Sequence, residues 1–187
     1  MDSKLQIISG MYRGRHLYLP PDARPTQNMA REALFNMLDS GIIDPWGRFV
    51  VWDAFAGSGA LGLECLSRYP NARVMFTDTL GSSVQTVKKN MEMLGVGGRA
   101  AVEHRDAVRA INTYGAAVDL FFVDPPYVQH RTGKKFLTRL ASVAKKGAIV
   151  VWEQEIGHEI PPDGRHWEIL RDKNYGRARF LILRKKH

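Results

Sequence analysis

The stretch that decides the fold is Val50-Val51-Trp52-Asp53-Ala54-Phe55-Ala56-Gly57-Ser58-Gly59-Ala60-Leu61-Gly62-Leu63-Glu64. It predicts a short strand over residues 49–52, a loop of small residues and the first turn of a helix. A continuous apolar run is typical of a parallel strand buried on both faces. The spacing Gly57-x-Gly59-x-x-Gly62 matches the glycine fingerprint of nucleoside-cofactor sites. The alternative is a glycine-rich turn that only packs.

Two acidic residues favour the cofactor interpretation. Asp78 ends the next expected strand, residues 73–78, where an acid can accept hydrogen bonds from ribose hydroxyls. Asp53 directly precedes the glycine loop, where it would repel the pyrophosphate of a dinucleotide. An acid at this place fits a cationic ligand better. S-adenosylmethionine carries an ammonium and a sulfonium and no phosphate, so we expect it as the cofactor, and an NAD-linked oxidoreductase is disfavoured.

Composition sets the class of protein. The 187 residues include 44% apolar and 25% charged residues, which is ordinary for a globular domain. No window approaches the roughly 18 apolar residues of a membrane span, and the N-terminus lacks a signal-peptide pattern. Cys65 is the single cysteine, and the six histidines lack ligand spacing, so we expect neither a disulfide nor a metal. The expectation is a cytoplasmic monomer without membrane contact.

The formal charge of +8 is unevenly distributed. Residues 1–31 carry five basic and two acidic side chains (+3), and residues 165–187 carry eight and two (+6). The remaining residues, 32–164, have a net charge of −1. This asymmetry suggests a polyanionic partner, most simply nucleic acid. The alternative is a basic surface that only contacts solvent.

The N-terminal part predicts a hairpin and a helix, which we assign as an RNA-contacting extension over residues 1–40. Arg13 and Arg15 are expected to project near the hairpin turn with Tyr12 between them, an arrangement suited to phosphate contacts and base stacking. The alternative is an exposed hairpin tip. Thr26 is expected to cap the following helix. One face of that helix should carry Met29 or Ala30, Ala33, Leu34, Met37 and Leu38, with Arg31, Glu32 and Asn36 on the other sides.

Residues 41–187 alternate strands with helices and predict an α/β fold, a Rossmann-like sheet of seven strands with helices on both faces. Later strands are expected at 100–105, 118–123, 147–153, 167–171 and 177–183, and a helix at 134–145. The last two strands should form an antiparallel edge. Asp106 follows the third strand, where it could accept from an adenine amine or cap the next helix.

Asp124-Pro125-Pro126-Tyr127 follows the fourth strand and is the most specific short motif. Two prolines fix the backbone and donate no hydrogen bonds. The Asp124 carboxylate and the Pro125 carbonyl can therefore both accept from one exocyclic amine, while Tyr127 stacks on the ring. Such a grip would free the nitrogen lone pair for in-line methyl transfer, catalysed by positioning and electrostatics. The alternative is a proline turn after a buried strand.

Taken together, these motifs resemble class I S-adenosylmethionine-dependent methyltransferases, and more closely the RsmD family, which methylates guanine N2 in small-subunit (16S) ribosomal RNA. The marks are residues 8–15, Arg24-Pro25-Thr26, Arg31-Glu32, residues 53–64 and residues 124–127. Ser9 stands where relatives commonly have glycine, and Tyr127 where many have phenylalanine.

The resemblance implies roles for particular residues. The cofactor would be contacted by Asp53, Phe55, Gly57, Gly59, Asp78 and Asp106, with Asp78 at the ribose and Asp106 at the adenine, and Thr26 and Arg31 would close over the cofactor or the RNA. RNA would be bound by Arg13, Arg15 and Arg24. The guanine amine would be held by Asp124, Pro125, Pro126 and Tyr127. The partner would be ribosomal RNA or an assembling small subunit. Alternatives are an amino-methyltransferase for adenine N6, cytosine N4 or a protein amide, and a non-catalytic RNA-binding module.

Overall fold

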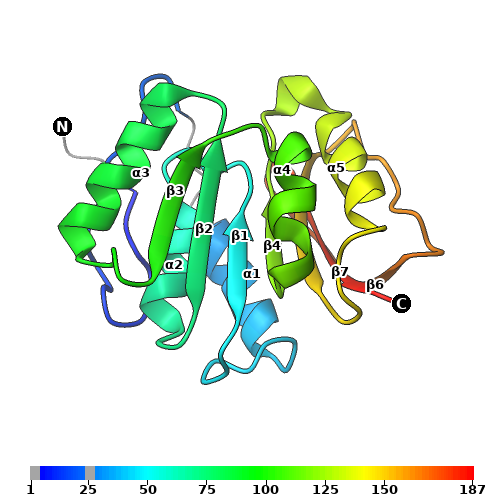
Figure 1. Cartoon of the computed structure of the whole chain (residues 1–187), viewed down its shortest axis with the longest axis horizontal. Helices are drawn as coiled ribbons and strands as arrows, with labels where there is room; N and C mark the ends of the chain where they lie inside the picture. The colour runs from blue at the N-terminus through cyan, green and yellow to red at the C-terminus, as the bar shows by residue number, and fades with distance from the viewer. Residues whose placement is uncertain (1–4, 24–27) are drawn as a thin grey trace.

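The computed structural model describes residues 5–23 and 28–187 and contains one seven-stranded sheet of order β3-β2-β1-β4-β5-β7-β6 (Figure 1). The strands are β1 Val50–Asp53, β2 Arg73–Asp78, β3 Ala100–His104, β4 Leu120–Val123, β5 Ile149–Glu155, β6 Trp167–Tyr175 and β7 Ala178–Lys185. The first five are parallel, and β7 pairs antiparallel with both β5 and β6. The predicted fold class is confirmed.

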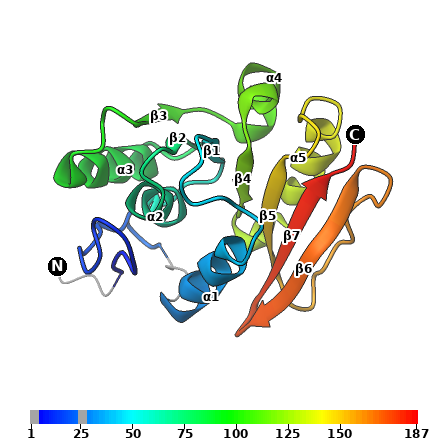
Figure 2. The same cartoon turned by 90° about the horizontal axis from the view of Figure 1, so that it is seen from below.

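Helices cover both faces of the sheet. They are α1 Asn28–Asp39, α2 Ala60–Arg68, α3 Gly81–Leu94, α4 Ala107–Tyr114 and α5 Thr132–Leu140, with short 3-10 helices at Gly115–Ala117 and Tyr127–Gln129. Figure 2 shows α1, α2 and α3 on one side of the sheet and α4 and α5 on the other. No helix within residues 5–23 and 28–187 has both the length and the apolar character needed to cross a bilayer.

The alternation of side chains along each strand builds two cores. In β4, Leu120 and Phe122 belong to the core under α1 to α3, whereas Phe121 and Val123 belong to the core under α4 and α5. Both sets are buried, as the continuous apolar run of a central strand requires. Burial on both faces therefore explains why β4 has no polar residue.

The N-terminal hairpin is less regular than predicted. Gln6 and His16 form a single isolated bridge, and the backbone then turns through Gly10 and lies against α2. Gly10 has φ +89, and a Cβ atom there would lie 2.1 Å from the carbonyl oxygen of Ser67. Close contact with a helix backbone therefore shapes this segment in addition to the backbone hydrogen bonds across the hairpin. Leu5 and Ile7 are buried in the same core as α1 and α2.

Two details of the helix predictions were wrong. Arg31 is predicted away from the apolar face of α1, but it is fully buried; of the two alternatives Met29 and Ala30, it is Ala30 that is buried. The reason is a buried acid on α2, Glu64, which lies 3.6 Å from the Arg31 guanidinium. The helix predicted at residues 134–145 is shorter and earlier, ending at Leu140.

Candidate active site

The glycine loop joins β1 to α2 in the predicted geometry. Gly57 and Gly59 have φ values of +58 and +83, which favour glycine. A Cβ on Gly57 would have no heavy atom within 4 Å, so the loop borders open space there. A Cβ on Gly62 would lie 2.3 Å from the ring of Phe76, so this glycine permits close packing of α2 on β2.

Asp53 lies at the end of β1 with its carboxylate buried beneath the loop. It is 1% exposed, and its Oδ2 accepts a hydrogen bond from the backbone N–H of Gly62 at 3.0 Å. Burial, opposed by the Gly62 hydrogen bond and assisted by the charge of Asp78, raises the pKa of Asp53 to about 7. A cation bound above this carboxylate would stabilise its ionised form.

Asp78 ends β2 and supports the same loop. Its Oδ2 accepts from the Gly57 N–H at 2.9 Å, and its Oδ1 accepts from the Leu80 N–H at 2.9 Å. Each carboxylate oxygen has two lone pairs, so acceptor capacity remains for ribose hydroxyls. The ribose contact stays a prediction.

Asp106 follows β3 and caps α4. Its Oδ1 accepts from the Arg109 N–H at 3.1 Å, which is the capping interpretation. The adenine contact is compatible with this bond and stays a prediction. Phe55 is half-buried, with its ring 5.8 Å from that of Phe136.

The Asp-Pro-Pro-Tyr motif leaves β4 beside the second half of β5. Val123 pairs with Trp152, so the next residues of the two strands, Asp124 and Glu153, emerge side by side. The Tyr127 hydroxyl donates to Oε1 of Glu153 at 2.9 Å. Burial, followed by the charge of Glu153 and a hydrogen bond to it, raises the pKa of Asp124 well above its usual range. The geometry thus brings the predicted motif to an acid that sequence reasoning missed.

An acid lies at or just beyond the carboxyl end of each of the first four parallel strands: Asp53, Asp78, Asp106 and Asp124; in the fifth, Glu153 lies two residues before the end. This edge is where ligands bind in open α/β sheets. The rule that identified the first four also applies to Glu153, which ends the strand predicted over residues 147–153. The position of Glu153 at the end of the predicted strand could therefore have identified it as a site residue.

Beside the motif lies a hollow whose lining includes Pro125, Pro126, Tyr127, Trp152 and Glu153. At its rim the rings of His130 and His158 stack at 4.1 Å, and Glu155 lies close enough for the three potential ligand atoms to fall within 4.8 Å of one another. Glu155 is also paired with Arg177. The expected absence of a metal stays a prediction.

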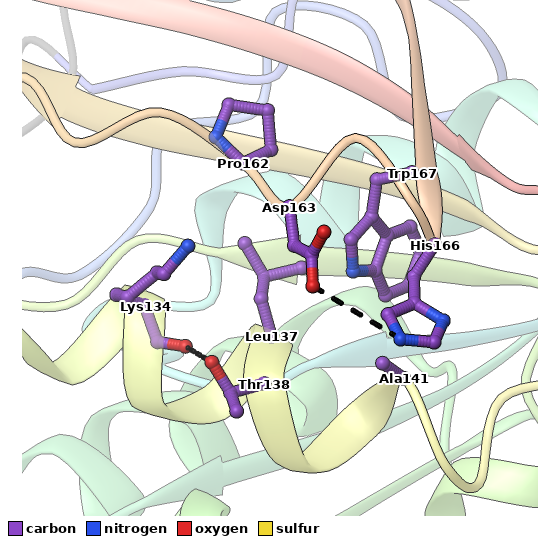
Figure 3. Close-up of a pocket in the computed structure, with 8 residues that line it drawn as sticks. All are labelled: Lys134, Leu137, Thr138, Ala141, Pro162, Asp163, His166 and Trp167. Atoms are coloured by element: carbon purple, nitrogen blue, oxygen red, sulfur yellow. Dashed lines mark hydrogen bonds and ion pairs between the residues drawn. The ribbon is translucent and has the colours of Figure 1, made fainter.

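A separate hollow lies between α5 and the loop before β6 (Figure 3). Its lining contains none of the predicted site residues. There His166 Nε2 lies 4.0 Å from Asp163 Oδ2, and the Thr138 hydroxyl bonds to the Lys134 carbonyl at 2.8 Å. Both are local contacts, so we do not assign the proposed chemistry to this hollow.

The N-terminal candidates are dispersed. Arg24 and Thr26 lie outside the described residues. Arg31 Nη2 donates to the Gln6 carbonyl at 2.7 Å and to the Asn28 side chain, and its Nη1 lies 3.6 Å from Glu64 on α2. Contact with a cofactor stays a prediction for it.

Arg13 and Arg15 are exposed, and Arg15 Nη2 donates to the carbonyl of Met93 near the end of α3. The adjacent turn bonds to Ser67 in the last turn of α2. Helices of βαβ units run back from the carboxyl edge of the sheet, so both arginines lie toward the edge opposite the glycine loop. Their role in RNA binding stays a prediction.

The fold and the acid-lined edge define a Rossmann-like protein of the methyltransferase class. Residues 5–184 match the family model described as "Conserved hypothetical protein 95", and the chain belongs to this family, the RsmD family. It is 33% identical over 187 residues to "Ribosomal RNA small subunit methyltransferase D" of Escherichia coli (strain K12), covering 98% of this chain and 91% of that protein.

Solved structures agree with the fold. "Putative methyltransferase yhhF from Escherichia coli" superimposes with a TM-score of 0.81 at 32% identity, covering 97% of each chain. An RNA methyltransferase from Salinibacter ruber, in complex with S-adenosyl-L-homocysteine, shares the fold with a TM-score of 0.66 at 15% identity, covering 88% of this chain and 95% of that one.

Proposed function

We propose that this chain transfers a methyl group from S-adenosylmethionine to the exocyclic N2 amine of a guanine in small-subunit ribosomal RNA. The observation that carries the proposal is the group of hydrogen-bond acceptors formed by Asp124, Pro125 and Glu153 at the edge that also holds the glycine loop. Membership of the RsmD family supports ribosomal RNA as the substrate.

The residues at the glycine loop fit the cofactor. Gly57 leaves space for close approach, Asp78 retains lone pairs for ribose hydroxyls, and the buried Asp53 carboxylate would be compensated by a cationic group. S-adenosylmethionine supplies an electrophilic methyl group when bound. The chain holds it on one side of the site and the base on the other.

The Asp-Pro-Pro-Tyr motif after β4 holds the base that receives the methyl group. Asp124 and the Pro125 carbonyl accept from the two N–H bonds of the amine and fix its orientation, which is the main source of rate enhancement when no covalent intermediate is needed. Pro126, in extended conformation with φ −52 and ψ 139, keeps this backbone rigid. Tyr127 is held by Glu153, so its ring is oriented before the base arrives.

The proposed partner is ribosomal RNA or an assembling small subunit, and the proposed state is a cytoplasmic monomer with residues 1–40 as the RNA-contacting extension. Several C-terminal cations are partly neutralised within the protein: Arg177 by Glu155, Arg179 by Asp172 and Arg184 by Glu168. Asp172 and Glu168 are already counted in the net charge of +6 for residues 165–187, so only the pair with Glu155 reduces the basic surface further.

Transfer of labelled methyl groups tests the proposal. The purified chain is incubated with labelled S-adenosylmethionine and naked small-subunit rRNA, partly assembled small subunits or duplex DNA, and the nucleosides are analysed. Label in N2-methylguanosine is expected. Label in a different base would retain the enzyme class and reject the substrate, whereas no label would favour a protein substrate or a non-catalytic RNA-binding module.

Cofactor affinity should rise with pH through the titration of Asp53. Its pKa near 7 in the free protein means that a cation must displace a proton at lower pH. If binding holds Asp53 ionised, affinity should rise roughly tenfold between pH 6 and pH 7.5. Calorimetry on the wild type and on Asp53→Asn separates this effect from titration of the cofactor, because the variant should lack the proton-linked increase. The same slope in both proteins would contradict the prediction.

Replacing Arg13 and Arg15 by alanine should weaken RNA binding and flatten its salt dependence, since each lost phosphate contact lowers the slope by about 0.7–0.9. Because both lie away from the glycine loop, turnover at saturating RNA should be unchanged. Lys146→Ala with Lys173→Ala removes the same charge from two other exposed positions and is the control. An unchanged salt slope would mean that the two arginines do not contact RNA phosphates.

A further inference from the structure

Glu153 carries a buried carboxylate oxygen that the protein leaves without a hydrogen-bond donor. The residue is 7% exposed, and its Oε1 accepts from the Tyr127 hydroxyl at 2.9 Å. Its Oε2 is buried and has no hydrogen-bond donor within residues 5–23 and 28–187. An unsatisfied buried carboxylate oxygen is costly, so its presence at a pocket indicates a ligand that donates a hydrogen bond to it.

The surroundings of this oxygen are rich in acceptors. Asp124 follows β4 directly beside Glu153, because the preceding residues Val123 and Trp152 are paired. Pro125 and Pro126 add carbonyl oxygens and no N–H groups. Tyr127 already uses its hydroxyl hydrogen on Glu153, which fixes the orientation of that carboxylate. The inner wall of the hollow therefore presents acceptors to whatever enters.

Nucleobases differ in the hydrogen-bond donors and acceptors that they present to such a surface. Guanine presents two adjacent donors on its Watson–Crick edge, N1–H and the N2 amine. Adenine presents the N6 amine next to the lone pair of N1, and cytosine presents the N4 amine next to the lone pair of N3. A flipped base is read through this edge. With the amine held by Asp124 and Pro125, a second carboxylate beside them attracts guanine and repels the other two bases.

We propose that Glu153 is a specificity-determining residue, whose Oε2 accepts a hydrogen bond from guanine N1–H and thereby selects guanine over adenine and cytosine. The proposal rests on the proposed function, since it names the residue that reads the base at the same site. The family motif at residues 124–127 accounts for the amine, and Glu153 accounts for the identity of the base.

The test compares guanine with 2-aminopurine at the nucleotide that the wild-type enzyme methylates. 2-Aminopurine keeps the N2 amine but has a lone pair at N1 in place of N1–H. Two otherwise identical RNAs are prepared by ligation, and kcat/KM is measured for each. The wild type should prefer guanine by about ten- to a hundredfold or more, the effect of one hydrogen bond to a charged group. A wild type that uses both RNAs equally would overturn the proposal without any variant.

The same two RNAs are then compared with the variant Glu153→Gln. Its amide oxygen can still accept from Tyr127, while its NH2 group donates to the N1 lone pair of 2-aminopurine. The preference for guanine should shrink at least tenfold or reverse. Glu155→Gln, two residues along β5, should keep the wild-type ratio. Equal losses on both RNAs in Glu153→Gln would make the residue merely structural and overturn the proposal, whereas a wild type that methylates no guanine would reject the proposed function itself.

Discussion

Asp124→Ala should reduce methyl-transfer turnover by about 10²–10³-fold, the usual effect of removing one preorganised hydrogen-bonding group from a reaction centre. The variant loses the carboxylate that, with the Pro125 carbonyl, orients the amine. Cofactor affinity should change by less than about twofold, because the predicted cofactor contacts lie at β1, β2 and β3. Single-turnover rates and calorimetry measure the two effects separately.

The stability of this variant makes the result interpretable. Burial and the neighbouring Glu153 disfavour ionisation of Asp124, so its removal relieves an unfavourable buried pair instead of breaking a favourable one. The urea midpoint should therefore be unchanged or higher, as is common when a strained functional group is removed. Asp124→Asn keeps an acceptor oxygen and should retain more activity than alanine. Near-normal turnover in Asp124→Ala would remove Asp124 from the chemistry.

The sheet was predictable because its signals are local. Apolar runs such as residues 120–123 identify central strands, and glycines at fixed spacing identify the βα turn. Acids that directly follow strands identify the ligand-binding edge, because the carboxyl ends of parallel strands meet there. These inferences need only the order of residues along the chain.

The remaining features depend on contacts between distant residues. The burial of Arg31 cannot be inferred from α1 alone, since Glu64 on α2 is what compensates it. The register of β4 and β5, which brings Glu153 beside Asp124, is likewise set by packing of the whole sheet. The sequence placed Arg13 near a turn but could not show that the turn lies against the last turn of α2.

Glu64 connects three parts of the described chain. Its carboxylate accepts from the backbone N–H groups of Ile8 and Ser9 at 3.0 and 3.1 Å and from Arg68 Nε at 2.9 Å. Arg31 Nη1 lies 3.6 Å away, and both side chains are fully buried. Burial lowers the pKa of Arg31 while Glu64 raises it, so the acid keeps the buried guanidinium charged.

Glu64→Ala should destabilise the protein by about 3–5 kcal/mol, because it leaves a buried cation uncompensated and two backbone donors without an acceptor. For a domain of this size the melting temperature should fall by roughly 6–20 °C. Glu32→Ala, an exposed acid on α1, should change stability by less than about 0.5 kcal/mol. Adding Arg31→Met to Glu64→Ala should recover part of the loss, since the double variant no longer buries an unpaired charge. Fully additive losses in urea denaturation would show that the two side chains do not interact, and would leave the N–H groups of Ile8 and Ser9 as the reason that Glu64 stabilises the fold.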